Sequence, residues 1–511
     1  MSRPPNLLLL MADQLAAQWL PAYGHSVVHA PALTRLAAAG VVFDAAYCAS
    51  PLCAPSRSAM LCGRRPSEIG VYDNAAPLAS DAPTVAHLLR AAGYHTVLAG
   101  KMHFVGPDQL HGYEERLTTD VYPGGLDWTP DWRLGPGERL PWYHNVASLL
   151  RAGVHESAMQ TDYDDEVCFH AVAKLRELGR SADQRPFFLT VSFTSPHDPW
   201  EVRARHWDLY ADAPIGPPAS APVPRAEADP HSLRLRDMAG LDERPLTEAE
   251  LRRARRAYFA AVSYVDERIG EVLAALEATG RAGDTVVVFT SDHGEMLGER
   301  GLWYKMSFLE PSARVPLIVA GPGIGPGRVA APVSQLDLAP TLAGLAGAAA
   351  EEAELEGTDL RPLLADAGPG PEAVLGEYLA EGVTAPAVMV RRGAWKFVRC
   401  PGDPDQLFDV AADPGEHRDL ADDPAHADLV ARFGAECDAR WDLGRIDAAV
   451  RASQRRRRVA GRALARGAHT PWDFQPYVDA TRRYVRGADA GRDRPGERPL
   501  GGGLPEAGPD E

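Results

Sequence analysis

Short apolar runs alternate with longer stretches of helical periodicity over most of the chain. The apolar runs are typical of strands buried in a parallel sheet and occupy 6–12, 41–43, 95–99, 186–193, 286–290 and 314–320. The amphipathic stretches predict helices at 31–40, 83–92, 162–179, about 247–280 and from about 337. This alternation predicts an α/β domain built on a mostly parallel sheet.

After about residue 350 the pattern changes to short strands and a few helices. Strands at 388–390 and 395–398 are joined by a hairpin-like turn, and helices run from about 425 to 460. This pattern predicts a smaller α+β unit. We expect a large α/β domain at 1–365, a smaller α+β subdomain at 366–465 and a C-terminal tail at 466–511.

Three further segments lack a clear period. Residues 212–245 are rich in Pro and Asp and are expected to form a loop. Residues 487–511 are rich in Gly, Pro and charge and are expected to be disordered. The four arginines at 455–458 are expected to form a solvated helix face or an oligomer contact.

Charge limits the partners that the chain can have. The 511 residues are 45% hydrophobic and 24% charged, which is ordinary for a globular protein, and the net charge is −17. Such a charge argues against binding to nucleic acid or to an anionic membrane. It also opposes an anionic substrate, unless the site is locally basic or the substrate carries a cation.

The chain shows no sign of export. The apolar run at 6–12 is too short to span a membrane, and no small-residue cleavage site follows it. Six cysteines in a chain of this length do not form a disulfide scaffold. We therefore expect a cytoplasmic protein with free thiols.

Polar residues follow several of the predicted strands. Asp13 follows the first strand, and the pair Asp292-His293 follows the strand at 286–290. Because ligands in open α/β sheets bind beyond the carboxyl ends of strands, these residues are candidate ligands for a divalent cation. The alternative is a turn or N-cap aspartate at position 13, and a turn Asp with a solvent-facing His at 292–293.

Basic side chains stand at the same positions after other strands. Lys101 and His103 follow the strand at 95–99, His197 follows the strand at 186–193, and Lys305 comes shortly after Asp292-His293. Lys supplies a point charge for an anion and His a proton donor for a leaving group. Lys101 and His103 could instead be an ordinary surface pair.

Cys53 stands at the start of a probable helix, in Cys53-Ala54-Pro55-Ser56-Arg57, followed by an apolar run and Gly63. A lone cysteine here could simply be buried beside a helix N-terminus. The whole stretch, however, resembles the signature of the type I sulfatases of the alkaline-phosphatase superfamily. In that family the cysteine is oxidised to formylglycine, whose hydrate carries two hydroxyls on one carbon. One hydroxyl attacks sulfur, and loss of the proton of the other expels sulfate as the carbonyl re-forms.

Residues 107–145 form a long segment rich in Pro, Gly and aromatic residues, including Trp128, Trp132, Trp142 and Tyr143-His144-Asn145. Aromatic faces attract a quaternary ammonium group through cation–π interaction. The same residues could equally form a small satellite core, and the segment alone does not decide between the two.

The resemblance is strongest to the choline-sulfatase branch of the family. The stretches that carry it are 11–15, 51–57, 100–104, 106–112, 131–132, 142–145, 292–294, 298–305, 376–378 and 470–473. The resemblance implies an alkaline-phosphatase-like fold with a central mixed, mostly parallel sheet flanked by helices. It also implies hydrolysis of choline-O-sulfate to choline and sulfate. Choline-O-sulfate is a zwitterion, which is compatible with an acidic protein.

The resemblance also implies roles for individual residues. One divalent cation, Ca²⁺ before Mn²⁺ or Mg²⁺, is expected on Asp13, Gln14, Asp292, His293 and the formylglycine made from Cys53. The groups expected around the nucleophile and the sulfate are Arg57, Asn74, Lys101, His103, His197 and Lys305. The ammonium end is expected against Trp128, His144 and Asn145, with Glu381 and Asp473 as candidate acidic partners.

Several alternatives stay open. Many arylsulfatases have Asp where this chain has Gln14 and Asn where it has His293, and the pattern here is also similar to phosphonate monoester hydrolases. An arylsulfatase, a phosphonate monoester or phosphodiester hydrolase, and a non-enzymatic choline-binding protein are therefore the competing functions. The expected partners are a formylglycine-generating maturation enzyme and further copies of the chain, in a dimer or tetramer whose C-terminal tail reaches a neighbour.

Overall fold

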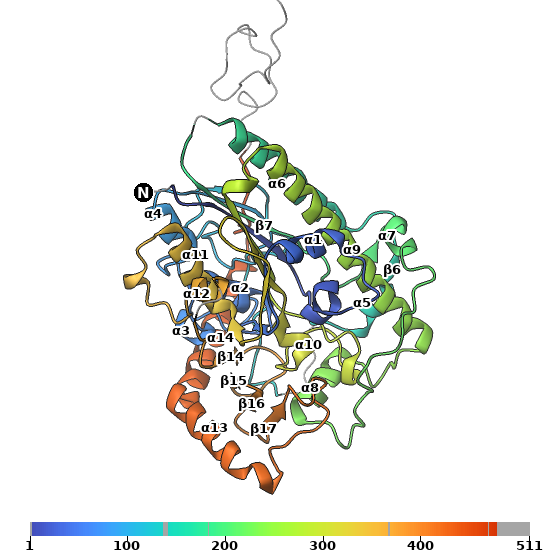
Figure 1. Ribbon diagram of the computed structural model, residues 1–511. Helices are drawn as coiled ribbons and strands as arrows, with labels where there is room; N and C mark the ends of the chain where they lie inside the picture. The colour runs from blue at the N-terminus through green and yellow to red at the C-terminus, as the bar shows by residue number, and fades with distance from the viewer. Residues whose placement is uncertain are drawn as a thin grey trace, which may run out of the picture.

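An eight-stranded sheet forms the centre of the computed structural model, which describes residues 3–135, 140, 142–181, 183–365, 368–468 and 470–477 (Figure 1). In spatial order its strands are β12 (Gly327–Val329), β2 (Val41–Phe43), β11 (Leu317–Ala320), β9 (Thr285–Ser291), β1 (Asn6–Ala12), β7 (Phe187–Ser192), β4 (His95–Gly100) and β5 (Glu115–Arg116). Strands β9, β1, β7 and β4 are mutually parallel, whereas β11 is antiparallel to β9 and to β2. The predicted mixed, mostly parallel sheet is confirmed.

Helices cover both faces of this sheet. On one side lie α1 (Pro31–Ala39), α6 (Met159–Arg180) and α9 (Glu248–Ala278), and on the other lie α2 (Cys53–Cys62), α4 (Val85–Ala91) and α11 (Leu338–Ala346) (Figure 1). Because both faces are covered, every residue of β1 is buried, which explains its unbroken apolar run. Helix α9 begins with a capping box, in which the Thr247 side chain accepts from the Glu250 amide.

Two predicted segments differ from the structure. The expected loop at 212–245 contains helix α8 (Pro230–Ala239), because its Asp and Pro are an N-cap and a first helical residue: the Asp229 side chain accepts from the Ser232 amide. The expected single strand at 314–320 is divided at Pro316, which has no amide hydrogen to donate. Its first part, β10 (Arg314–Val315), joins a separate small sheet with β3 (Ala46–Tyr47) and β13 (Val333–Ser334).

A second sheet follows in the C-terminal part of the chain. Its four antiparallel strands are β14 (Val374–Tyr378), β15 (Ala387–Arg392), β16 (Trp395–Arg399) and β17 (Gln406–Asp409). Helix α13 (Ala427–Arg440) packs on this sheet, and helix α14 (Leu443–Leu464) follows it. The predicted hairpin is confirmed, while the domain boundaries stay a prediction and the expected disorder at 487–511 lies outside the described residues.

The remaining elements are short connections around these layers. They are α3 (Pro66–Ile69), α5 (Val146–Arg151), α7 (Ala204–Asp208), α10 (Glu310–Ala313), α12 (Arg361–Leu364), β6 (Gly153–Val154) and β8 (Glu201–Val202). None of the helices that the structure describes is both long enough and apolar enough to cross a membrane.

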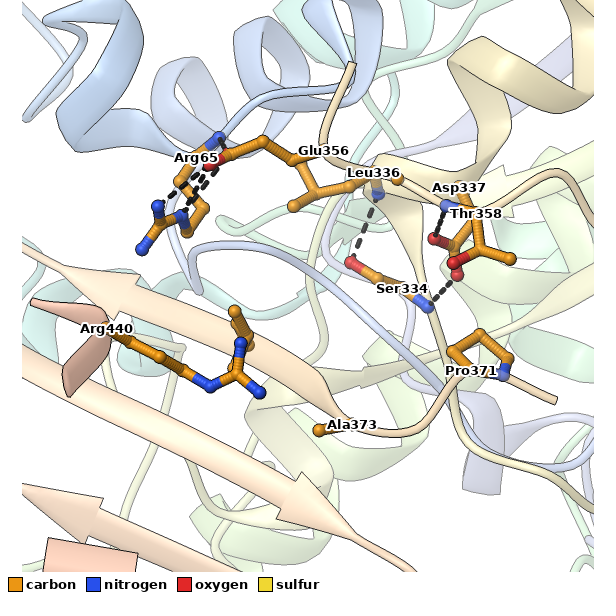
Figure 2. A pocket seen from close by; sticks show the side chains of 11 residues that line it. Arg65, Ser334, Leu336, Asp337, Glu356, Thr358, Pro371, Ala373 and Arg440 are labelled. Atoms are coloured by element: carbon orange, nitrogen blue, oxygen red, sulfur yellow. Dashed lines mark hydrogen bonds and ion pairs between the residues drawn. The ribbon is translucent and has the colours of Figure 1, made fainter. Parts of the chain in front are cut away.

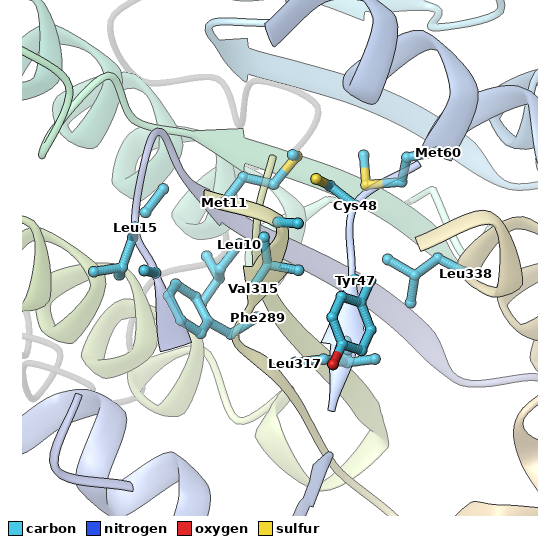
Figure 3. Close-up of a cluster of buried hydrophobic side chains, with 14 of the residues drawn as sticks. Leu10, Met11, Leu15, Tyr47, Cys48, Met60, Phe289, Val315, Leu317 and Leu338 are labelled. Carbon is cyan, nitrogen blue, oxygen red and sulfur yellow. The ribbon is translucent and has the colours of Figure 1, made fainter. Parts of the chain in front are cut away.

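The core beneath α2 fixes the position of that helix. Met60 of α2, Leu338 of α11, Leu10 and Met11 of β1, and Phe289 of β9 are all buried in one cluster (Figure 3). A polar cavity of about 340 Å³ opens elsewhere, beside Asp337, Glu356 and Arg440 (Figure 2). None of the predicted site residues lines that cavity.

Candidate active site

Polar side chains from several strand ends meet at one edge of the central sheet. Asp13 follows β1, Lys101 follows β4, and Asp292 follows β9, so the parallel direction of these strands places their ends together. The side chain of each is fully buried. The first turn of α2 brings Cys53 to the same edge.

Four of the predicted metal ligands form one cluster. Ligand atoms of Asp13, Cys53, Asp292 and His293 all lie within 4.8 Å of one another. The Cys53 Sγ lies 3.2 Å from His293 Nε2 and 4.0 Å from Asp13 Oδ1. Two carboxylates and an imidazole are suitable donors for a divalent cation, so the residues present fit the expected metal.

The charge states of this cluster also suit a cation. Burial alone would raise the pKa of Asp13, but the charges of Lys101 and Arg57 outweigh it and hold that pKa well below its usual range. The pKa of Asp292 is likewise lowered, because Arg57 outweighs the effect of burial. Burial lowers the pKa of His293 to about 4, so its imidazole is neutral and free to act as a ligand.

Arg57 connects α2, the helix that begins at Cys53, to residues at the ends of the strands. Its Nε donates to Asp292 Oδ2 at 2.7 Å, and its Nη1 donates to the Lys101 carbonyl and to Ser192 Oγ, each at 2.8 Å. Its Nη2 is buried 3.7 Å from Asp13 Oδ2 and has no hydrogen-bond partner. Arg57 therefore orders the site and keeps one buried donor for an anionic ligand.

A basic centre formed by Lys305 and His197 lies beside the cluster of metal ligands. Lys305 Nζ donates to Gln14 Oε1 at 2.6 Å and lies 2.7 Å from His197 Nε2. His197, His144 and Asp198 also bring possible metal ligands within reach of one another, but the Lys305 ammonium already contacts His197. This centre suits an anion better than a second cation, and burial with the charge of Lys305 lowers the pKa of His197.

Asn74 and Gln14 are held by contacts within the chain. Asn74 Oδ1 accepts from the amide of Ala54 at 3.0 Å, directly after Cys53, and so supports the start of α2. Gln14 has a φ of 63° and donates through Nε2 to Glu295 at 2.6 Å and to Asp198 at 3.2 Å. Its role as a metal ligand stays a prediction.

The family described as Sulfatase matches residues 5–348. A choline-sulfatase of Rhizobium meliloti is 50% identical over 94% of this chain and 96% of its own length, and an arylsulfatase K of Danio rerio is 31% identical over 82% and 80%. The chain belongs to the sulfatase family. Two C-terminal families also match, Choline sulfatase enzyme C terminal at 448–489 and N-sulphoglucosamine sulphohydrolase, C-terminal, at 298–440.

Solved structures agree with this sulfatase fold. A 2-O GAG sulfatase has a TM-score of 0.67 at 25% identity and covers 97% of this chain and 99% of its own. A phosphonate monoester hydrolase from Silicibacter pomeroyi has a TM-score of 0.68 at 24% identity, over 84% of this chain and 94% of its own. At that identity the second likeness concerns the fold alone.

The rings of Trp128, Tyr122 and Trp142 form an aromatic wall that borders the sulfatase site. The ring of Trp128 meets His103 edge-on at 5.8 Å and Tyr122 at 5.2 Å, and it stacks on Trp142 at 6.2 Å. Both ring nitrogens of His103 are buried without a hydrogen-bond partner. His103 therefore packs against the wall and keeps a free imidazole for a substrate atom.

The remaining predicted substrate residues have different surroundings. His144 stacks on Tyr304 at 4.6 Å and its Nδ1 lies 3.2 Å from Asp198. Asn145 is exposed and caps α5, accepting from the amide of Ala147 at 2.9 Å. Neither contact tests a role in substrate binding, which stays a prediction for both.

The two candidate acidic partners are also placed differently. Glu381 is 4% exposed and its Oε2 has no hydrogen-bond partner. Asp473 Oδ1 accepts from the amide of Gly124 at 2.8 Å, four residues before Trp128. The segment 470–477 therefore docks on the loop that carries the aromatic wall.

Sequence reasoning missed residues that hold the site together. Tyr122 packs its ring against the Lys101 ammonium at 4.2 Å and places its hydroxyl 3.3 Å from His197 Nε2. Glu295 binds Gln14. Asp198 and Glu295 stand beside predicted site residues and could have been suspected, whereas Tyr122 lies in a long loop with no local signal.

Proposed function

We propose that this chain hydrolyses choline-O-sulfate to choline and sulfate, as a formylglycine-dependent sulfuric ester hydrolase. The observation that carries the proposal is the 50% identity to a choline-sulfatase over nearly the whole of both chains. The match of residues 448–489 to the C-terminal family of choline sulfatases supports the same substrate. The arylsulfatase relative is far less similar, at 31% identity.

The proposed reaction needs two groups that the chain must acquire, an aldehyde made from Cys53 and a divalent cation. It also uses the residues around them. The hydrated aldehyde derived from Cys53 supplies an oxygen nucleophile and a carbonyl that can re-form to release sulfate. A divalent cation, for which we propose Ca²⁺, would lie on Asp13, Asp292, His293 and the derivative of Cys53, with Gln14 as a further candidate, and would neutralise negative charge.

The side chains of this site act on the sulfate by fixed charge. Lys101 and the free Nη2 of Arg57 lie beside Asp13, and Lys305 lies beside Gln14. These three buried cations are the candidates to hold the sulfate oxygens, and their burial strengthens the attraction. His103 and His197 are the candidates for proton transfer to the departing choline oxygen. His197 is held by Lys305 and by the Asp198 carbonyl, which its Nδ1 contacts at 2.6 Å, so its ring is oriented before substrate arrives.

The ammonium group would lie against the aromatic wall of Trp128 and against His144. A cation gains from the faces of Trp and from a nearby carboxylate. Glu381, buried and without a hydrogen-bond partner on Oε2, is the candidate for that carboxylate. Asn145 and Asp473 remain further candidates for contact with this end of the substrate.

Maturation, assembly and compartment complete the proposal. Cys53 is 1% exposed, so a maturation enzyme would need to reach it before the fold closes. Within one chain the segment 470–477 contacts Gly124 through Asp473. We propose a homo-oligomer in which the C-terminal tail at 466–511 also contacts a neighbour. All six cysteines are free and buried, which supports a reducing compartment such as the cytoplasm.

The test is sulfate release from choline-O-sulfate, an aryl sulfate and a phosphodiester, compared as kcat/KM on one preparation. We expect choline-O-sulfate to be preferred by more than about 2–3 kcal/mol of transition-state binding. Preference for the aryl sulfate would favour an arylsulfatase, and preference for the phosphodiester would favour a phosphodiester hydrolase. Either result would overturn the proposed substrate while leaving the fold and the nucleophile in place.

A further inference from the structure

Arg457 does not belong to a solvated arginine face, unlike Arg455 and Arg456. Arg455 and Arg456 are exposed on α14, whereas Arg457 is 6% exposed. The expectation of a solvated or oligomer-contacting cluster is therefore wrong for Arg457. Its helical position turns it inward, toward the loops of the active site.

The guanidinium of Arg457 joins two separate loops. Its two terminal nitrogens donate to the two carboxylate oxygens of Asp73, each at 2.7 Å, and Nη1 also donates to Thr129 Oγ1 at 3.2 Å. Its Nε donates to Ser453 Oγ at 3.1 Å. Asp73 is fully buried, and the planar guanidinium of Arg457 balances its charge in the interior.

One of these loops leads to the nucleophile. Asp73 precedes Asn74, whose side chain accepts from the amide of Ala54, the residue after Cys53. Asp73 Oδ1 also accepts from the amide of Ala75 at 3.0 Å, which fixes the turn that carries Asn74. A displacement of Asp73 would therefore be passed to the first turn of α2.

The other loop leads to the aromatic wall. Thr129 follows Trp128, and its hydroxyl donates to the Leu126 carbonyl at 2.7 Å while it accepts from Arg457. Helix α14 supports the same loop elsewhere, since Gln454 Oε1 accepts from the amide of Trp132 at 3.1 Å and Arg458 pairs with Asp131.

We propose that Arg457 is a positioning residue that holds the nucleophile helix and the Trp128 loop at a fixed separation, and thereby sets the preference for substrates with an ammonium head. The inference rests on the proposed function. A substrate with an ammonium head must have its sulfate at the nucleophile and its ammonium group at the aromatic wall at the same time. An ester without that head needs only the position of its sulfate to be correct.

The test compares choline-O-sulfate with ethyl sulfate, which keeps the alkyl sulfate but lacks the ammonium head. We expect Arg457→Met to lower the ratio of their kcat/KM values by at least tenfold. Arg457→Lys should recover part of the ratio, because lysine can pair with Asp73 but lacks the planar fork. Arg455→Met, on the exposed face of the same helix, should keep the ratio within twofold of the wild type.

A second variant separates positioning from stability. Thr129→Val keeps the buried ion pair and removes the hydroxyl that accepts from Arg457 and donates to the Leu126 carbonyl. It should lower the ratio by roughly threefold or more. The ratio does not depend on the fraction of folded enzyme, so partial unfolding cannot imitate the effect. If Arg457→Met yields no folded protein, Thr129→Val carries the test.

The outcomes distinguish the two proposals. A wild-type preference for choline-O-sulfate that survives unchanged in both Arg457→Met and Thr129→Val would overturn the positioning role alone. A wild-type enzyme that hydrolyses the two esters equally well would overturn the proposed function, and this inference with it.

Discussion

Single side chains in the site carry charges that burial would suppress if each stood alone. Asp13, Lys101 and Arg57 are fully buried, yet the attraction between the two cations and the carboxylates of Asp13 and Asp292 keeps all three ionised. Asp13 and Lys101 could be predicted because each follows a strand, and Arg57 because it lies in the stretch that resembles the sulfatase signature. The sequence could not predict Tyr122 or Arg457, whose positions depend on how a long loop and a distant helix pack.

Cys53 carries the sharpest prediction at this scale. Cys53→Ala removes the nucleophile and should lower turnover of choline-O-sulfate by at least about 10³-fold. Cys62→Ala is the matched control, since Cys62 is equally buried at the other end of α2 within a small apolar cluster. Sulfate release and thermal melting measured on both variants check this, and near-normal turnover in Cys53→Ala would contradict the assignment.

The raised pKa of Glu381 predicts that kcat/KM depends on pH. Burial, with the charge of Asp73, raises the pKa of its carboxyl from 4.5 to about 7. The ionised form attracts an ammonium group, so kcat/KM for choline-O-sulfate should rise up to about tenfold between pH 6 and pH 8. Glu381→Gln should remove this rise. A wild-type profile that is flat across that range would contradict the role.

The same carboxyl should affect stability in the opposite direction. Because the folded state favours protonated Glu381, its stabilising contribution is complete below about pH 4.5 and is lost as the pH rises through about 7. Glu381→Gln should therefore gain stability relative to the wild type between pH 5 and pH 8, by up to about 3 kcal/mol. Urea unfolding at the two pH values measures this difference.

At the scale of elements, the strand ends decide where the chemistry lies. The apolar runs predicted β1, β4, β7 and β9 closely because each is buried on both faces. Helix α8 was missed because Asp and Pro mark loops and helix starts alike. The order of strands in the sheet could not be derived from the periodicity, since it depends on contacts distant in sequence.

Gly100, at the end of β4, tests how tightly one such strand end is packed. Its φ is +100°, and an added Cβ would lie 1.9 Å from the Ser192 carbonyl oxygen. Gly100→Ala should cost more than about 2 kcal/mol of folding free energy and displace Lys101. Gly93→Ala is the control, because its φ is +88° with no atom within 4 Å, and should cost only about 1 kcal/mol. Equal losses of folding free energy in Gly100→Ala and Gly93→Ala, measured by urea unfolding, would contradict the close packing at Gly100.

At the scale of the whole molecule, a buried ionic contact joins the C-terminal sheet to the segment that follows Lys305. Lys396 of β16 donates to Glu310 Oε1 at 2.8 Å and lies 2.5 Å from Glu416. It also donates to the Phe308 carbonyl at 2.6 Å, three residues after Lys305. The C-terminal sheet therefore supports the segment that carries Lys305.

Removal of this contact should weaken the whole fold. Lys396→Met leaves Glu310 and Glu416 without their shared cation and should cost about 3–5 kcal/mol. Lys174→Met is the control, because its partners Glu115 and Glu177 are 39% and 58% exposed, and should cost less than about 1 kcal/mol. Denaturant unfolding checks both, and a Lys396 variant as stable as the Lys174 variant would contradict the coupling.

The net charge of −17 affects which substrates the whole molecule attracts. An acidic molecule repels simple anions, while its buried site collects the positive charges of Arg57, Lys101 and Lys305. A zwitterion is compatible with both features, because its ammonium end is attracted where its sulfate end is not.

The central claim is that the site recognises the ammonium charge of choline-O-sulfate. The most direct measurement compares its kcat/KM with that of 3,3-dimethylbutyl sulfate, in which a carbon replaces the charged nitrogen. The account predicts that the charged ester is preferred by at least about 30-fold, as expected for a cation desolvated against aromatic faces. Equal rates for the two esters, within about twofold, would contradict it.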